Sequence, residues 1–188
     1  MSKLQDRLLY SDRAQKVYAS LLFFFCLVVL IWAIVFKFNI NSLLSIERNR
    51  ALPLWERFVE GLVPFRSLID SLNPVNWWQI GVFLLNILCF IPTGMLLPFI
   101  TSRKKCLLFL LLFPISLELF QLFSGFGILD TTDLITNFFG GYIGCKIYDL
   151  LYPRLSKKAI NTMLLSLLLP AFSVGVFVTV RTVLYFPI

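Results

Sequence analysis

The chain has 188 residues, of which 59% are hydrophobic and 14% are charged. Soluble globular domains have an apolar share nearer ~45–50%, so this composition excludes a soluble fold and indicates an integral membrane protein. The formal net charge of +7 does not require a nucleic-acid partner. Membrane proteins collect basic residues in their cytoplasmic loops for a topological reason.

The first apolar run, Val17–Phe36, follows a basic start. It is longer than the roughly 7–15-residue apolar core of a signal peptide, and no small-residue cleavage pattern follows it, so we expect an uncleaved signal-anchor helix. A long connection, Lys37–Leu72, comes next. Within it, apolar residues recur at helical spacing over Trp55–Val63, with Arg57 on the opposite, polar side. This pattern predicts a short interfacial helix that Pro64 would end.

Four further runs approach the ~20 residues that cross the hydrocarbon core of a bilayer. They lie within Ser71–Ser102 and at Cys106–Phe123, Asp133–Tyr152 and Ala159–Val180. Basic residues cluster before the first helix, after the second and after the fourth, and the positive-inside rule places these alternate segments in the cytoplasm. We therefore expect one all-α domain over residues 1–188. It would be a polytopic membrane helix bundle with five transmembrane helices, N-terminus in and C-terminus out, plus the interfacial helix.

Polar residues inside the predicted spans are the candidates for function. Glu118 and Gln121 are three positions apart and share one helix face. A carboxylate at a helix centre costs roughly 2.5–3.5 kcal/mol on insertion scales, so Glu118 is expected to face the bundle interior and to be functional. Asp133 and Asn137 share a face of the fourth span. Asp130 precedes them by a turn, where an aspartate caps free N–H groups and favours the positive end of the helix dipole.

The second predicted span adds Asn86 at a similar depth, so three helices contribute polar groups to the outer half of the membrane. Arg66 precedes that span and is a nearby basic residue. We expect these residues to line an outer-leaflet pocket. The predicted ligand-binding set is Glu118, Gln121, Asp130, Asp133, Asn137, Asn86 and Arg66.

Other residues of the spans are predicted to be structural. Gly140 and Gly144 form a small-xxx-small pair that lets another helix backbone approach closely. Pro92 and Gly94 shape the second span near its cytoplasmic end. The four cysteines have no paired spacing, so neither a disulfide framework nor a zinc site is indicated. We expect no metal and no cofactor.

These motifs resemble those of the VanZ-like family. "GLVPFRSL" (Gly61–Leu68) is similar to the family's N-L-x-P-F-R element, and "NILCFIPTGMLLP" (Asn86–Pro98) is similar to N-x-x-x-F-x-P-x-G-x-x-x-P. "SLELFQLF" (Ser116–Phe123) resembles the E-x-x-Q element. "DTTDLITNFFGGYIG" (Asp130–Gly144) resembles D-x-x-D-x-x-x-N-x-x-G-x-x-x-G. The resemblance covers about Gly61–Leu151, and its specificity comes from four elements in the same order at matching spacings.

The resemblance implies a small multi-pass protein of a mainly Gram-positive bacterial cell membrane. It also implies reduced susceptibility to teicoplanin, a lipoglycopeptide antibiotic, without remodelling of the peptidoglycan precursor. Many relatives carry an arginine three positions before the first aspartate of the D-x-x-D element, where this chain has Gly127. This departure makes Arg66 the expected basic partner of the acids.

Two main functions remain open at this stage. The first is a non-enzymatic membrane protein whose outer pocket binds membrane lipid, a lipid-linked cell-wall precursor or a lipoglycopeptide. The second is an intramembrane enzyme in which Glu118, Asp130 and Asp133 act as acid and base or hold a divalent cation, with a polyprenyl phosphate or glycolipid as substrate. The chain has no histidine and shows no catalytic triad, so the first is favoured. A transporter ranks last, because the intramembrane acids occur on one side only and no internal repeat appears.

Overall fold

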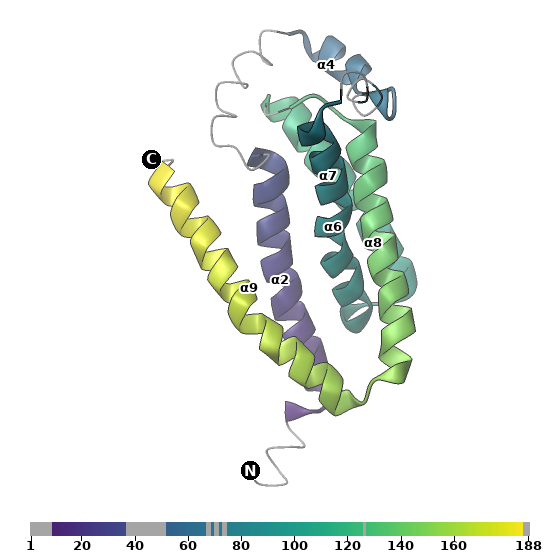
Figure 1. Ribbon diagram of the computed structural model, residues 1–188, viewed down its shortest axis with the longest axis vertical. Coiled ribbons are helices and arrows are strands. Elements are labelled where there is room, and N and C mark those ends of the chain that lie inside the picture. The colour runs from purple at the N-terminus through teal and green to yellow at the C-terminus, as the bar shows by residue number, and fades with distance from the viewer. Residues whose placement is uncertain are drawn as a thin grey trace.

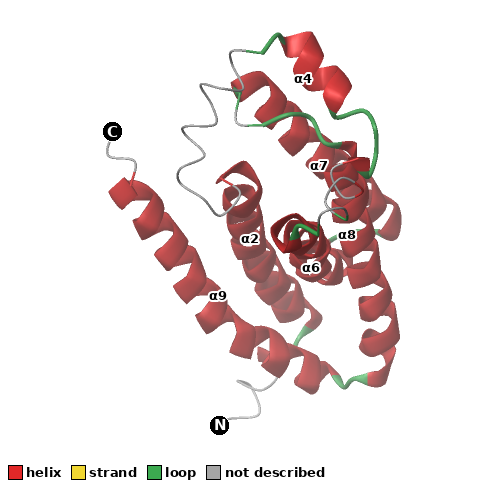
Figure 2. Ribbon diagram, turned by 45° about the horizontal axis from the view of Figure 1, so that its top comes forward, coloured by secondary structure: helices red, strands yellow, loops and turns green. Residues whose placement is uncertain are grey.

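The computed structural model describes residues 9–36, 52–66, 69, 72, 75–125 and 127–185, and these are helical apart from their loops (Figure 2). The long helices are α2 (Asp12–Phe36), α6 (Trp77–Ile100), α7 (Arg103–Ser124), α8 (Thr131–Leu151) and α9 (Lys157–Tyr185). The short ones are α4 (Leu54–Glu60) and the 3-10 helix η1 (Tyr152–Arg154).

Each of the five predicted spans forms a long helix, which confirms the all-α class. Within the described part of the chain, three stretches are long and apolar enough to cross a membrane: Asp12–Trp32, Ile80–Ile100 and Arg103–Ser124. Helix α8 has 21 residues and α9 has 29. These findings support a membrane protein that crosses the bilayer with helices.

Helix α4 corrects the sequence interpretation in two respects. It ends at Glu60 rather than at Pro64, because Gly61 caps it with a backbone N–H that donates to Val59 O. Arg57 was expected on the polar, outward side, yet its side chain is only 6% exposed. Its Nη1 donates to Leu122 O at 2.8 Å, because the last carbonyls of helix α7 have no partner in their own helix. Residues 37–51 of the predicted connection lie outside the described residues.

Helices α6 and α8 form the tightest pair in the bundle and run side by side in the same direction (Figure 1). A methyl group added at Gly140 would lie 2.2 Å from Ile87 O, and one added at Gly144 would lie 2.1 Å from Ile91 O. At Gly94 the added methyl would lie 1.9 Å from Gly141 O. The two backbones therefore touch along a seam that side chains would force apart.

Helices α2, α6 and α9 share a second, apolar core. Its buried residues are Ala19, Leu22, Leu96, Ile160 and Leu164. Helix α9 packs on α2 near its own start and leans away from it toward the C-terminus (Figure 1).

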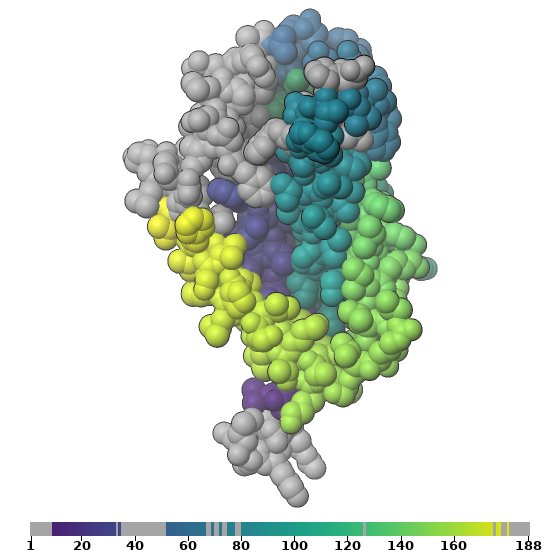
Figure 3. All heavy atoms as spheres, viewed as in Figure 1, coloured from purple at the N-terminus to yellow at the C-terminus, as the bar shows by residue number. Residues whose placement is uncertain are grey.

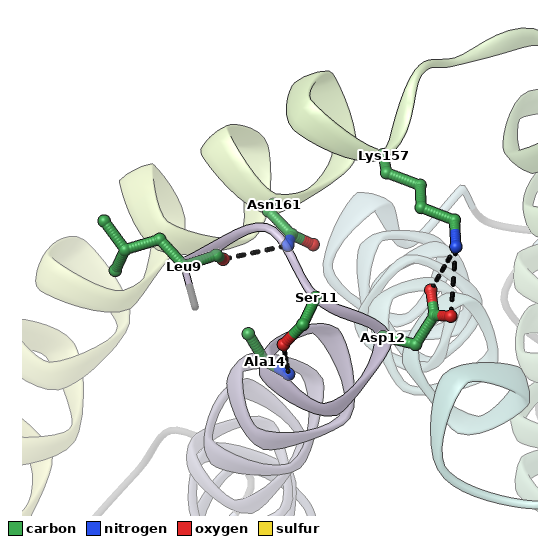
Figure 4. A network of polar contacts seen from close by, with 6 residues as sticks. All are labelled: Leu9, Ser11, Asp12, Ala14, Lys157 and Asn161. Carbon is green, nitrogen blue, oxygen red and sulfur yellow. Dashed lines mark hydrogen bonds and ion pairs between the residues drawn. The ribbon is translucent and has the colours of Figure 1, made fainter. Parts of the chain in front are cut away.

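The starts of α2, α7 and α9 meet at one end of the bundle, together with the end of α8 (Figure 1). Lys157 pairs with Asp12 at 2.8 Å, and Asn161 Nδ2 donates to Leu9 O at 3.0 Å (Figure 4). Arg103 pairs with Asp149. This end, which we call the basic end, carries the clusters of lysine and arginine, and the start of α8 lies at the opposite end.

Candidate functional site

The start of helix α8 joins two chain segments that are far apart in sequence. Thr131 donates to Gly61 O twice, from its backbone N at 3.0 Å and from its hydroxyl at 2.6 Å. The Thr132 hydroxyl accepts from Phe65 N at 2.9 Å. The turn after α4 is therefore fixed against the first turn of α8, and the "GLVPFRSL" element contacts the D-x-x-D element.

Glu118 lies at the same place, inside the bundle. Its side chain is 1% exposed, and its Oε2 accepts from Asp130 N at 2.9 Å. The Asp130 carboxylate in turn accepts from Thr132 N at 2.8 Å and caps α8. Two acids therefore stabilise the start of α8. Asp130 caps a free N–H group with its side chain, and Glu118 accepts from the backbone N–H of that capping residue.

Asp133 connects α8 to α6. Its Oδ1 accepts from Asn86 Nδ2 at 2.6 Å. Both side chains are half-buried. This hydrogen bond joins the first turn of α8 to the first half of α6.

Gln121 binds neighbouring backbone on two sides. Its Nε2 donates to Ile34 O at 2.7 Å, near the end of α2. The backbone carbonyl of Gln121 accepts from Gly125 N at 3.1 Å and from Gly127 N at 3.2 Å. Gly125 has φ of 83°, a left-handed conformation that glycine adopts without strain at a helix C-terminus. A side chain at Gly127 would lie 3.5 Å from the Gln121 side chain, so this position faces Gln121.

Asn137 lies one turn after Asp133 along α8, and it is 1% exposed. Its Oδ1 has no hydrogen-bond partner among the described residues. A buried polar atom of this kind costs free energy unless something pairs with it. Asn137 is therefore a member of the predicted set whose side-chain oxygen is buried without a hydrogen bond from the described residues.

Phe65 adopts a strained backbone conformation beside this network. Its φ is 61°, a left-handed value that costs a bulky residue on the order of 1–3 kcal/mol. The hydrogen bond from Phe65 N to Thr132 holds it there. Such strain gathers at binding sites, and this one directly precedes Arg66, which is exposed.

Sequence reasoning missed Arg57. It was assigned to the outward face of α4 because helical spacing shows which residues share a face, but not which face turns toward the protein. The buried guanidinium lies at the C-terminal end of α7, next to the turn that follows Gln121. The sequence carries no signal for this contact, because Arg57 and the α7 carbonyl that accepts from it are far apart in the chain.

We refer to Asn86, Glu118, Gln121, Asp130, Asp133 and Asn137 as the outer polar network. Glu118, Gln121 and Asn137 are buried, whereas Asn86, Asp130 and Asp133 are partly exposed. Within the part of the chain that the structure describes, no three acidic or cysteine side chains are grouped so that they could hold a metal ion. The arrangement offers amide and carboxylate oxygens at the surface, supported by a buried polar layer.

The comparisons with known proteins agree with the motif assignment. The VanZ/LLP1 family model matches residues 23–152, a range that begins within α2 and ends in η1. Protein VanZ of Enterococcus faecium is 30% identical over 144 residues, which cover 74% of this chain and 78% of that protein. No solved structure matches the chain.

Proposed function

Because the chain belongs to the VanZ/LLP1 family, we propose that it lowers the susceptibility of a Gram-positive cell to teicoplanin-type lipoglycopeptides through the outer polar network. The observation that carries this proposal is that the family's sequence elements, separated by tens of residues, converge on the first turns of α8. The bonds that join them are Thr131 to Gly61, Asp130 to Glu118, and Asn86 to Asp133. Convergence of separate motifs on one place is typical of a binding site.

The members of the network divide into two roles by burial. Asn86, Asp130 and Asp133 are partly exposed and contact the ligand, together with the exposed Arg66. The buried Glu118 and Gln121 are positioning residues that hold the start of α8 and the end of α2. This division gives a role both to the acid inside the bundle and to the acids at its surface.

The proposed ligand is lipophilic or lipid-linked, either a cell-wall precursor or the lipoglycopeptide itself. Carboxylates and amides bind a cationic or amide-rich headgroup, and apolar residues beside them receive a chain. Trp55 of α4 is 70% exposed and Trp77 at the start of α6 is 77% exposed, as suits aromatic residues at a membrane interface. Occupation of this site would keep the antibiotic from its target at the membrane surface.

The finer topology is also a proposal: five transmembrane helices, with the N-terminus in and the C-terminus out. With 21 residues, α8 is about 31 Å long at the helical rise, which matches the ~30 Å hydrocarbon core. The basic end then faces the cytoplasm. Alkaline phosphatase fused after Arg154 should be inactive, and the same enzyme fused at Ile188 should be active; the reverse pattern would invert the topology.

The test of function is the susceptibility of a sensitive Gram-positive host to teicoplanin and to vancomycin. The informative variant is Asp133→Asn. It removes the carboxylate but keeps a side-chain oxygen that can accept the hydrogen bond from Asn86 Nδ2. Asp149→Asn is the matched control, because it removes a charge from the same helix at the basic end. We expect protection against teicoplanin with wild type and Asp149→Asn and loss of protection with Asp133→Asn. Full protection by Asp133→Asn at equal membrane levels would refute the assignment.

A further inference from the structure

An apolar groove lies between α6 and α9, with α2 as its floor (Figure 3). Its volume is about 650 Å³, within the ~300–1,000 Å³ of ligand pockets. The groove exists because α9 packs on α2 at one end only and then leans away. Its walls are Leu88, Pro92 and Phe99 of α6 and Leu167, Pro170 and Val174 of α9.

The groove has the length of one membrane leaflet. Along α6 it extends from Leu88 to Phe99, and along the tilted α9 from Ile160 to Val174, which is about 16 Å and about 21 Å at the helical rise. Half of the ~30 Å hydrocarbon core is ~15 Å. Because Tyr152 and Leu155 line it as well, the groove begins at the basic end and stops near the middle of the bundle. It therefore fits a single chain from the leaflet at the basic end.

Basic residues are sequence neighbours of the lining residues where the groove begins, which we call its mouth. Arg154 lies between the lining residues Tyr152 and Leu155, and Lys158 lies two residues before the lining residue Ile160. The acids described at this end, Asp12 and Asp149, each pair with another base. Arg154 donates from Nη1 to Leu150 O, and Lys158 lies over the Tyr10 ring, which leaves further donors on both cations for an anion.

We propose that this groove holds one acyl chain of an anionic glycerophospholipid, with the lipid phosphate at Arg154 and Lys158. The site is separate from the outer polar network and does not depend on the function proposed for it. The three helices that line the groove surround a chain on more sides than a flat helix face does. Charge at the mouth adds selectivity for an anionic headgroup.

Native mass spectrometry of the purified full-length protein, supplied with phosphatidylglycerol or phosphatidylcholine of identical chains, tests the proposal. We expect phosphatidylglycerol to be retained about fivefold more for each basic residue that contacts it. The double variant Arg154→Gln, Lys158→Gln should bind the two lipids equally. Equal retention of both lipids by wild type would overturn the headgroup assignment.

A second pair of variants tests the groove itself. Leu167→Trp fills the groove and should abolish retention of phosphatidylglycerol. Leu169→Trp is the control, since Leu169 is 77% exposed on the same helix and does not line the groove. Equal retention of phosphatidylglycerol by the two variants would overturn the groove assignment. The assignment would also fail if Leu167→Trp lost the lipid only in a dimer formed through α9, and the monomer still retained it.

Photo-crosslinking of wild type provides a test that needs no variant. Phosphatidylglycerol with a diazirine in its acyl chain should label peptides of α2, α6 and α9 that line the groove, including Cys26 and Cys89. Labelling spread evenly over the exposed faces of α7 and α8 would contradict the proposal.

Discussion

Helices α8 and α9 pack against the bundle in opposite ways. Helix α8 places Gly140 and Gly144 against α6, and the two backbones touch. Helix α9 packs bulky side chains such as Ile160 and Leu164 on α2 near its start and then departs. Without a hydrophobic force between helices in lipid, close packing and polar contacts hold a membrane bundle together. The comparison shows why α8 forms a sealed seam and α9 leaves a groove.

The largest expected effect comes from breaking that seam. Gly144→Leu would place its Cβ 2.1 Å from the Ile91 carbonyl oxygen. Because this neighbour is backbone, it cannot move aside as a flexible side chain can. The free energy of unfolding should therefore fall by at least the ~1–3 kcal/mol of an overpacked core. Thermal unfolding in detergent measures this. Gly81→Leu is the control, because a methyl group added there meets nothing within 4 Å beyond its chain neighbours and its own helix backbone. Similar unfolding temperatures for both variants would refute the seam.

A smaller loss of stability is expected from removing the polar contact at the start of α8. Glu118→Ala leaves the Asp130 N–H without its acceptor, which should cost ~1–3 kcal/mol. It should also lower protection against teicoplanin. Glu118→Gln retains an oxygen that can accept this hydrogen bond, so it should unfold at a higher temperature than Glu118→Ala. If Ala and Gln variants were equally stable, Glu118 would not position α8.

The smallest effect is expected at the attachment of α9. The Lys157 ammonium donates a hydrogen bond to the Asp12 carboxylate, which raises the pKa of Lys157 above the ordinary 10.5. A raised pKa of a base stabilises the fold below the ordinary pKa, and this contribution is lost only as pH rises through the raised value. Lys157→Gln should therefore shift the unfolding temperature little, and equally at pH 6 and pH 8. A shift that differs between these two pH values would contradict this account.

The sequence predicted the five long helices because their apolar runs are long and their ends carry basic residues. It also predicted that polar residues from three helices share one depth, and in the structure Glu118 accepts from Asp130 N and Asn86 donates to Asp133. It did not predict the burial of Arg57 or the groove. Both depend on how whole helices are placed: Arg57 on the position of the α7 terminus, and the groove on the tilt of α9, which packing rather than composition decides.

The function proposed above requires that the outer polar network keeps teicoplanin from its target. Its most direct test is the amount of fluorescently labelled teicoplanin and vancomycin that binds to cells of a sensitive Gram-positive host. The account predicts less bound teicoplanin with wild type than with an empty vector, unchanged vancomycin, and restored teicoplanin binding with Asp133→Asn at equal membrane levels. Equal teicoplanin binding by cells with wild type and with Asp133→Asn would contradict it.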